Sequence, residues 1–341
     1  GIAEAYSAGY WDADDMVKII QIVIKNQDIQ KSLEGGFAML LNPINRMIHR
    51  SRRNTVSGSK ENIVAHYDLS NEFFETWLDK SMTYSCAVFE PENLSLYDAS
   101  IEKLDRICRK LSIKADDHII EIGTGWGSFA IHAAKKYGCK ITTTTISNRQ
   151  HEYVSNLIKV EGLQDKITLL KDDYRSLNGQ YDKLVSIEMI EAVGYNFIQN
   201  FFETCSRLLK PNGIMAIQGI TYHEQGFENH LKSVDFIKKY IFPGSNLISV
   251  NHVLSTIKSY TDLSLVHLED ITKYYAETLK LWRDKYKDEF DKIKDMGYSD
   301  EFLRMWDYYF IYCEAGFRER FIGDVQLVMA KPENKNIQIN Y

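Results

Sequence analysis

The chain has 341 residues, which is long enough for one large α/β domain with a smaller accessory unit. Its net charge of −6 argues against nucleic acid as a partner, because nucleic-acid binding needs a basic face. No apolar run approaches the roughly 18 residues of a membrane-spanning helix. The five cysteines form no C-x-x-C pair, so we expect neither disulfides nor a metal site, and a reducing cytoplasm fits best. The first residue is Gly1 instead of Met, which suggests a trimmed start.

Residues 1–60 are predicted to form a helical N-terminal region, followed by a catalytic domain at residues 61–335. Apolar residues gather at 15–24 and 37–41, and a basic cluster then comprises Arg46, His49, Arg50, Arg52, Arg53 and Lys60. An apolar face beside arginines is typical of a helix lying on anionic lipid. A helix packed on the main domain with a solvated basic edge is the slightly favoured alternative.

Strand and helix patterns alternate over the rest of the chain. Strands are predicted at 118–122, 140–147, 167–170, 183–187, 214–220 and 321–329, and helices at 98–111, 129–137, 148–160, 197–209 and 274–317. After an insertion at 221–250 the β/α pattern resumes at 253–260 and 263–269. This alternation indicates an α/β fold with a mostly parallel sheet and helices on both faces.

The most informative segment is a glycine-rich loop that follows a buried strand. Gly123, Gly125 and Gly127 form Gly-x-Gly-x-Gly, with Glu121 in the strand just before them. Glycine lets the backbone turn tightly and approach a ligand. The last glycine of the dinucleotide fingerprint is missing, and a pyrophosphate does not need the preceding acid, whereas the cationic methionine part of S-adenosylmethionine does. The loop therefore favours S-adenosylmethionine over NAD.

One expected feature is missing at the end of the second strand. Nucleotide-binding folds often place an acid there for the ribose hydroxyls, but this strand ends in a run of four threonines, followed by Ile146 and Ser147. The threonine hydroxyls and Gln150 must serve instead.

Seven stretches together resemble the cyclopropane fatty acid synthases and the cyclopropane mycolic acid synthases. They read HYDLSNEFF at 66–74, MTYSCAVF at 82–89, TISNRQ at 145–150, DYR at 173–175, EMIEAVG at 188–194, DFIKKYIFPG at 235–244 and YYFIYCEAGFR at 308–318. The resemblance runs over nearly the whole chain and accounts for the absent acid in the second strand. It implies a Rossmann-like class I methyltransferase fold with a seven-stranded sheet.

The reaction that the resemblance implies is that of a cyclopropane-fatty-acyl-phospholipid synthase. The cis double bond of an unsaturated phospholipid acyl chain takes the methyl group of S-adenosylmethionine and becomes a carbocation, and a base then removes a proton so that the ring closes. Such a site must exclude water and present aromatic faces to the cation. The 21 tyrosines and 16 phenylalanines suit both needs.

In the family a bound bicarbonate is the base. Carried over by position, its ligands here are Cys86 (through the backbone), Glu191, the backbone of Ile220, and Tyr309. The family's usual histidine is replaced by Gln218, which can still donate a hydrogen bond to an anion but cannot relay a proton as histidine does.

The cofactor contacts that the resemblance implies lie in the glycine loop and in the family's motifs. They are Tyr67, Ser85, Gly123, Gly125, Trp126, Thr145, Ile146, Gln150, Asp173 and Tyr174, to which the loop argument adds Glu121. Trp126 and Tyr67 have a purely structural alternative as core residues.

Three other functions stay open. The first is a related methyltransferase that gives a methyl-branched, methylene or hydroxylated lipid. The second is a methyltransferase that acts on amines, which would not need Glu191 and Tyr309. The third is a membrane-associated scaffold without catalysis. For the cyclopropane synthase we expect a cytoplasmic protein in transient contact with the inner face of the membrane, and a homodimer is a further hypothesis.

Overall fold

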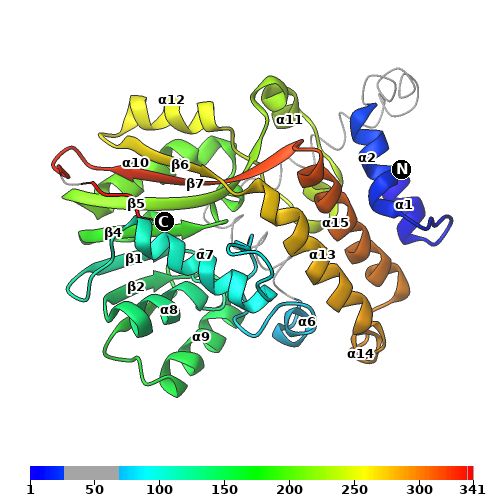
Figure 1. Ribbon diagram of the computed structural model, residues 1–341, viewed down its shortest axis with the longest axis horizontal. Coiled ribbons are helices and arrows are strands. Elements are labelled where there is room, and N and C mark those ends of the chain that lie inside the picture. The colour runs from blue at the N-terminus through cyan, green and yellow to red at the C-terminus, as the bar shows by residue number, and fades with distance from the viewer. Residues whose placement is uncertain (27–68, 336, 341) are drawn as a thin grey trace.

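The computed structural model describes residues 1–26, 69–335 and 337–340, and these contain one seven-stranded sheet (Figure 1). The strand order is β3-β2-β1-β4-β5-β7-β6. The strands are β1 (His118–Ile122), β2 (Lys140–Thr144), β3 (Ile167–Leu170), β4 (Tyr181–Ile187), β5 (Leu209–Tyr222), β6 (Ser264–Asp270) and β7 (Ile322–Ala330). All neighbours are parallel except those of β7, which runs antiparallel to β5 and β6. The predicted α/β fold with a mostly parallel sheet is confirmed.

Helices cover both faces of this sheet, as Figure 1 shows. One face carries α7 (Leu96–Lys110), α8 (Ser128–Tyr137) and α9 (Asn148–Val160), which share one hydrophobic core with the strands. The other face carries α10 (Ile198–Leu208) and α12 (Val250–Tyr260) over a second core. The central strand β1 has an almost entirely buried sequence because it is covered from both sides.

The predicted elements end where local caps stop them. Strand β2 is three residues shorter than predicted because the Ser147 hydroxyl accepts a hydrogen bond from Gln150 N, 3.3 Å away, and begins α9. The predicted helix at 274–317 is three helices, namely α13 (Thr272–Asp288), α14 (Phe290–Asp295) and α15 (Asp300–Arg318). Gly297, at φ +96°, follows α14, and Ser299 caps α15.

The helices α13 and α15 lie side by side beyond the sheet (Figure 1), and the N-terminal helices α1 (Ile2–Ser7) and α2 (Met16–Lys25) pack on α15. The insertion after β5 contains α11 (Phe227–Lys232) and a π-helical turn at Ile237–Ile241. The short helix α6 (Asn71–Glu75) precedes α7. The helices predicted between residues 37 and 60, with their basic cluster, lie outside the described residues.

Within the described parts of the chain, no helix is both long enough and apolar enough to cross a bilayer.

Candidate functional site

The glycine loop joins β1 to α8 and lines a cavity at the carboxyl ends of the parallel strands. Gly123, Gly125 and Gly127 all have positive φ, at +98°, +53° and +88°, which glycine adopts without strain. A Cβ on Gly125 would meet no atom within 4 Å, whereas one on Gly123 would approach Met189 Cγ to 2.9 Å. The backbone at Gly125 therefore faces open space that a ligand can approach closely.

Glu121 supplies a buried carboxyl group to the same cavity. Its Oε2 accepts a hydrogen bond of 2.5 Å from the Thr143 hydroxyl, which itself lies 2.7 Å from the hydroxyl of Thr124. Burial raises the pKa of Glu121 to about 8, although the bond from Thr143 and the charge of Lys103 lower it. A bound cation would favour the carboxylate.

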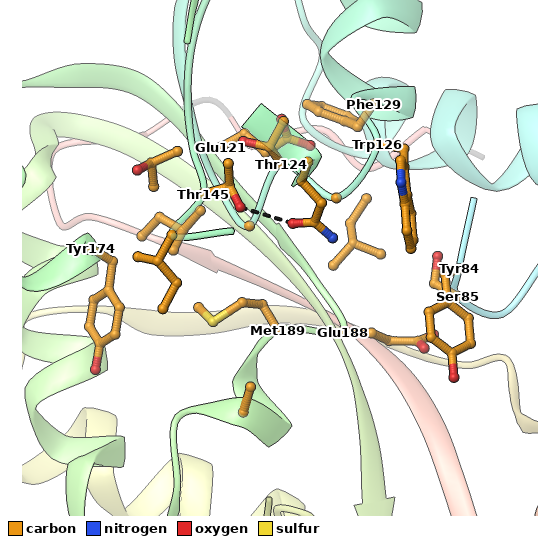
Figure 2. A pocket seen from close by; sticks show the side chains of 18 of the residues that line it. Tyr84, Ser85, Glu121, Thr124, Trp126, Phe129, Thr145, Tyr174, Glu188 and Met189 are labelled. Atoms are coloured by element: carbon orange, nitrogen blue, oxygen red, sulfur yellow. Dashed lines mark hydrogen bonds between the residues drawn. The ribbon is translucent and has the colours of Figure 1, made fainter. Parts of the chain in front are cut away.

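The end of β2 and the start of α9 present hydroxyl and amide groups where other folds place an acid. Thr145 donates to Gln150 Oε1 over 2.9 Å, as the dashed line in Figure 2 shows, and Ile146 lines the cavity beside them. Both polar side chains are buried and can turn toward ribose hydroxyls.

Asp173 and Tyr174 follow β3 and close one end of the cavity. Asp173 is held by Arg175, whose Nε and Nη2 each lie 2.7 Å from a carboxylate oxygen. The hydroxyl of Tyr174 is buried without a hydrogen-bond partner among the described residues. A buried, unsatisfied hydroxyl is costly, so this group fits a polar contact with a bound ligand.

The opposite end of the cavity is formed by Ser85, Trp126 and their neighbours (Figure 2). The fully buried Lys103 donates to the Ser85 hydroxyl over 2.6 Å. Trp126 donates from Nε1 to Asn71 Oδ1, 3.1 Å away, and packs against Phe74 with ring centroids 4.7 Å apart. Trp126 is thus both a packing residue and part of the wall. The predicted contact Tyr67 lies outside the described residues.

The described residues of this cavity fit S-adenosylmethionine. The open backbone at Gly125 lets a ligand approach closely, and the buried carboxyl group of Glu121 can pair with a cation. The unsatisfied hydroxyl of Tyr174 offers a polar contact at the far end of the cavity. Each predicted cofactor residue in the described part lies in this wall, but the individual contacts stay predictions.

A second cavity, of about 680 Å³, adjoins the first and is mostly apolar and aromatic. Its walls come from α1, α2, the insertion after β5, α13 and α15, and include Ile20, Ile24, Phe236, Phe242, Leu279 and Phe317. An elongated apolar molecule is the kind of ligand that such walls accept.

The two cavities meet at Tyr84, Glu188 and Ala192, which line both. The hydroxyl of Tyr84 lies 2.9 Å from that of Tyr309, and Phe242 packs beside both rings. In Figure 2 Tyr84 and Glu188 stand at the side of the first cavity opposite Tyr174. A group transferred from one cavity to the other would pass this junction.

At the junction, the groups predicted to hold bicarbonate contact carboxylates of the chain. Cys86 N and Gln218 Nε2 each donate to Glu188 Oε1 over 2.8 Å, and Tyr275 donates to Glu188 Oε2 over 2.5 Å. Burial, Asp324 and Glu188 raise the pKa of the Cys86 thiol well above its usual value, which leaves no thiolate nucleophile.

The amide orientation of Gln218 is fixed from the far side. Gln218 Oε1 accepts from Gln326 Nε2 over 3.0 Å, and Gln326 Oε1 in turn accepts from the buried Lys110 Nζ over 2.7 Å. The Gln218 amide nitrogen is thereby directed at Glu188, so Gln218 acts as a hydrogen-bond donor there.

Glu191 lies beside this group. Its Oε1 accepts from Ile220 N over 2.5 Å, and its Oε2 is buried without a partner among the described residues. Burial and then the charge of Glu188 raise the pKa of Glu191 to about 8, so it carries a proton at neutral pH.

Sequence reasoning missed Glu188 and Tyr275. The signal for Glu188 was an acid directly after a strand that neighbours the glycine-loop strand. Nothing in the sequence around Tyr275 distinguishes it from other helical tyrosines.

Comparisons with known proteins identify the family of the chain and its relatives. Residues 54–327 match the family described as mycolic acid cyclopropane synthetase. The chain is 34% identical over 343 residues to a tuberculostearic acid methyltransferase of Mycobacterium tuberculosis, covering 97% of this chain and 78% of that protein. It is 32% identical over 347 residues to the cyclopropane-fatty-acyl-phospholipid synthase of Escherichia coli, covering 99% and 85%. A mycolic acid cyclopropane synthase solved with SAH and CTAB superposes with a TM-score of 0.75 at 28% identity, covering 80% of this chain and 98% of that one.

Proposed function

The chain belongs to the mycolic acid cyclopropane synthetase family and is a S-adenosylmethionine-dependent methyltransferase; from this premise we propose that it methylates the double bond of an unsaturated phospholipid acyl chain and closes a cyclopropane ring there. The observation that carries the proposal is the junction of the two cavities at Tyr84, Glu188 and Ala192. The cavity that contains the glycine loop and Glu121 opens there into the second cavity, whose walls are mostly aliphatic and aromatic.

When bound, S-adenosylmethionine supplies an electrophilic methyl group. In our proposal Gly123, Gly125 and Glu121 hold its methionine part, Thr145 and Gln150 its ribose, and Asp173 and Tyr174 its adenine side. The chain's contribution is to position the two reactants and to keep water away from the cation, which would otherwise become an alcohol.

The aromatic residues beside the junction can keep water away from the cation. Tyr84, Tyr309 and Phe242 form one cluster that lines the apolar cavity. Aromatic faces attract a cation and leave it without a nucleophile, so the acyl cation is stabilised but not trapped.

A methyl-branched product is the second candidate. The 34% identity to a tuberculostearic acid methyltransferase favours it, since both products can arise from the same cation. The methylene product forms when a hydride first shifts from the methylated carbon to the neighbouring cationic carbon, after which the new methyl group loses a proton to form a double bond. A saturated methyl branch would then need a separate reductant.

The decisive experiment incubates the protein with S-adenosylmethionine and vesicles of monounsaturated phospholipid. We expect mass spectrometry to show the gain of one CH2 unit, and NMR to show cyclopropane protons in place of alkene protons. Retained alkene protons with the same mass gain would identify the methylene product. Unchanged lipid beside normal cofactor binding would refute the acyl-chain proposal.

We also propose a peripheral, transient contact with the cytoplasmic face of the membrane, through which the apolar cavity takes up its substrate. The division into a helical region at 1–60 and a catalytic domain at 61–335 remains a proposal, as does a homodimer. Bicarbonate as the base is the prediction from resemblance, and the surroundings of Glu188 bear on it directly.

A further inference from the structure

Glu188 has a backbone conformation that a glutamate rarely adopts. It follows β4 with φ +46°, in the left-handed region, where a residue with a Cβ is disfavoured by roughly 1–2 kcal/mol. Such strain persists only where other contacts hold it, and it gathers at functional sites.

Three hydrogen bonds hold the carboxylate of Glu188. Their donors are the Cys86 backbone, the Gln218 amide and the Tyr275 hydroxyl, at 2.8, 2.8 and 2.5 Å. They come from the segment before α7, from β5 and from α13, and all three residues are buried. Hydrogen bonds to a charged acceptor are about twice as strong as neutral ones. The fold thus builds an anion site and fills it with its own side chain.

Two of these donors are groups predicted to bind bicarbonate, namely Cys86 and Gln218. A third predicted donor, Ile220 N, is taken by Glu191. Three of the predicted donors are therefore already bonded to carboxyl groups of the chain, whereas the hydroxyl of Tyr309 lies 2.9 Å from that of Tyr84.

Glu188 also has the right place for chemistry, because it lines both cavities at their junction. We propose that Glu188 is the catalytic residue that accepts the proton from the methylated acyl chain, in place of bicarbonate. This inference rests on the proposed function.

In this step the alkene electron pair forms a bond to the methyl carbon, the carbon–sulfur bond breaks, and its electron pair remains on sulfur. The neighbouring acyl carbon becomes a cation. A Glu188 oxygen removes a proton from the new methyl group, and the electron pair of that C–H bond closes the ring. Glu188 ends the step as a neutral acid.

Neighbouring carboxyl groups give the proton a way onward. Gln218 Nε2 also donates to Asp324 Oδ2 over 3.1 Å. Burial, then the charge of Glu188 and a hydrogen bond to Glu188, raise the pKa of Asp324 well above its usual value. The acids beside Glu188 thus have raised pKa values, which favours exchange of a proton with Glu188 over the formation of a second buried charge.

The test compares wild type with Glu188→Gln and Glu188→Gly in buffer freed of carbon dioxide, with S-adenosylmethionine and monounsaturated phospholipid vesicles. Wild type should form product at the same rate with and without bicarbonate. Glu188→Gln, which keeps the side-chain shape, should lose at least about 100-fold in product formation or divert the product, as expected on loss of a general base. Its SAH affinity should stay within about threefold of wild type.

Glu188→Gly should fold, because glycine suits the left-handed backbone, and it should open the anion site. We expect its turnover to become dependent on bicarbonate. Bicarbonate stimulation of wild type, or an unchanged rate and product in Glu188→Gln, would overturn the inference.

Calorimetry with bicarbonate separates this inference from the proposed function, because it needs no turnover. Binding to Glu188→Gly but not to wild type supports the assignment even if no lipid is converted, in which case only the proposed substrate fails. Equal bicarbonate binding by wild type and Glu188→Gly would contradict the assignment of Glu188 as the base, whatever the lipid assay gives.

Discussion

Replacing Glu121 with Gln should stabilise the protein and weaken its cofactor pocket at the same time. Glu121 is 2% exposed, and burial raises the pKa of its carboxyl from 4.5 to about 8. Between these values the folded chain holds a proton that the unfolded chain releases. Because the folded pKa is the higher one, this group lowers stability progressively as the pH rises from 4.5 through 8.

The magnitude follows from the gap between 4.5 and 8, at ~1.36 kcal/mol per pH unit. The destabilisation by Glu121 is about 2 kcal/mol at pH 6 and approaches about 5 kcal/mol at pH 9. Glutamine keeps the shape, and its oxygen can still accept from Thr143, but it never ionises. The stability advantage of Glu121→Gln over wild type should therefore grow by about 3 kcal/mol from pH 6 to pH 9.

Urea denaturation of both proteins at the two pH values measures this advantage, and Glu152→Gln, exposed on α9, is the matched control. Calorimetry with SAH, which lacks the sulfonium charge but keeps the ammonium group of the amino-acid part, should show the opposite effect. Loss of one partner of a buried charge pair costs roughly 2–5 kcal/mol, so affinity should fall at least about 30-fold. A stability advantage that does not change with pH, or SAH binding as tight as in wild type, would refute the reasoning.

Two further predictions concern the walls of the two cavities. Gly125→Ala should lower the free energy of unfolding by only about 1 kcal/mol, because φ is +53° and the new Cβ has space, but it should bind SAH at least about tenfold more weakly. Gly162→Ala, with φ +67° and equal space outside the cavity, is the control for the backbone effect. Equal SAH affinity of the two variants would contradict the prediction. Ile24→Glu should lower lipid turnover at least about tenfold with SAH affinity unchanged, because the half-buried Ile24 lines the second cavity and a charge in that wall disfavours an acyl chain. Ile22→Glu, on the exposed face of α2, should have no such effect. A similar effect of both variants in the vesicle assay would show that α2 does not line the acyl path.

The fold could be read from the sequence because its signals are local. Buried strands, the glycine loop and the periodicity of α7 to α10 each lie within a short window, and their alternation predicts a mostly parallel sheet. The strand order and the antiparallel direction of β7 come from the structure alone. The element boundaries do not follow from these signals, because single residues decide them. Ser147 ends the β2 region by capping α9, and the break between α14 and α15 depends on Gly297 and Ser299.

The junction could be predicted only in part. Glu188 lies 102 residues from Cys86 and 87 from Tyr275 along the chain, so its hydrogen bonds exist only in the folded protein. The resemblance supplied Cys86, Gln218 and Ile220 as donors, but it could not show that the acceptors belong to the chain itself. The second cavity could not be predicted from the sequence either, because its walls come from both ends of the chain.

The left-handed backbone at Glu188 has an evolutionary consequence. Glycine is the residue that this conformation accommodates most easily, so a chain with glycine there would keep the fold and leave the three donors open to a dissolved anion. Glycine and glutamate codons can differ by a single nucleotide. One mutation could therefore convert an ancestor that uses dissolved bicarbonate as the base into one that uses its own glutamate. The same mutation would make its activity independent of dissolved carbon dioxide.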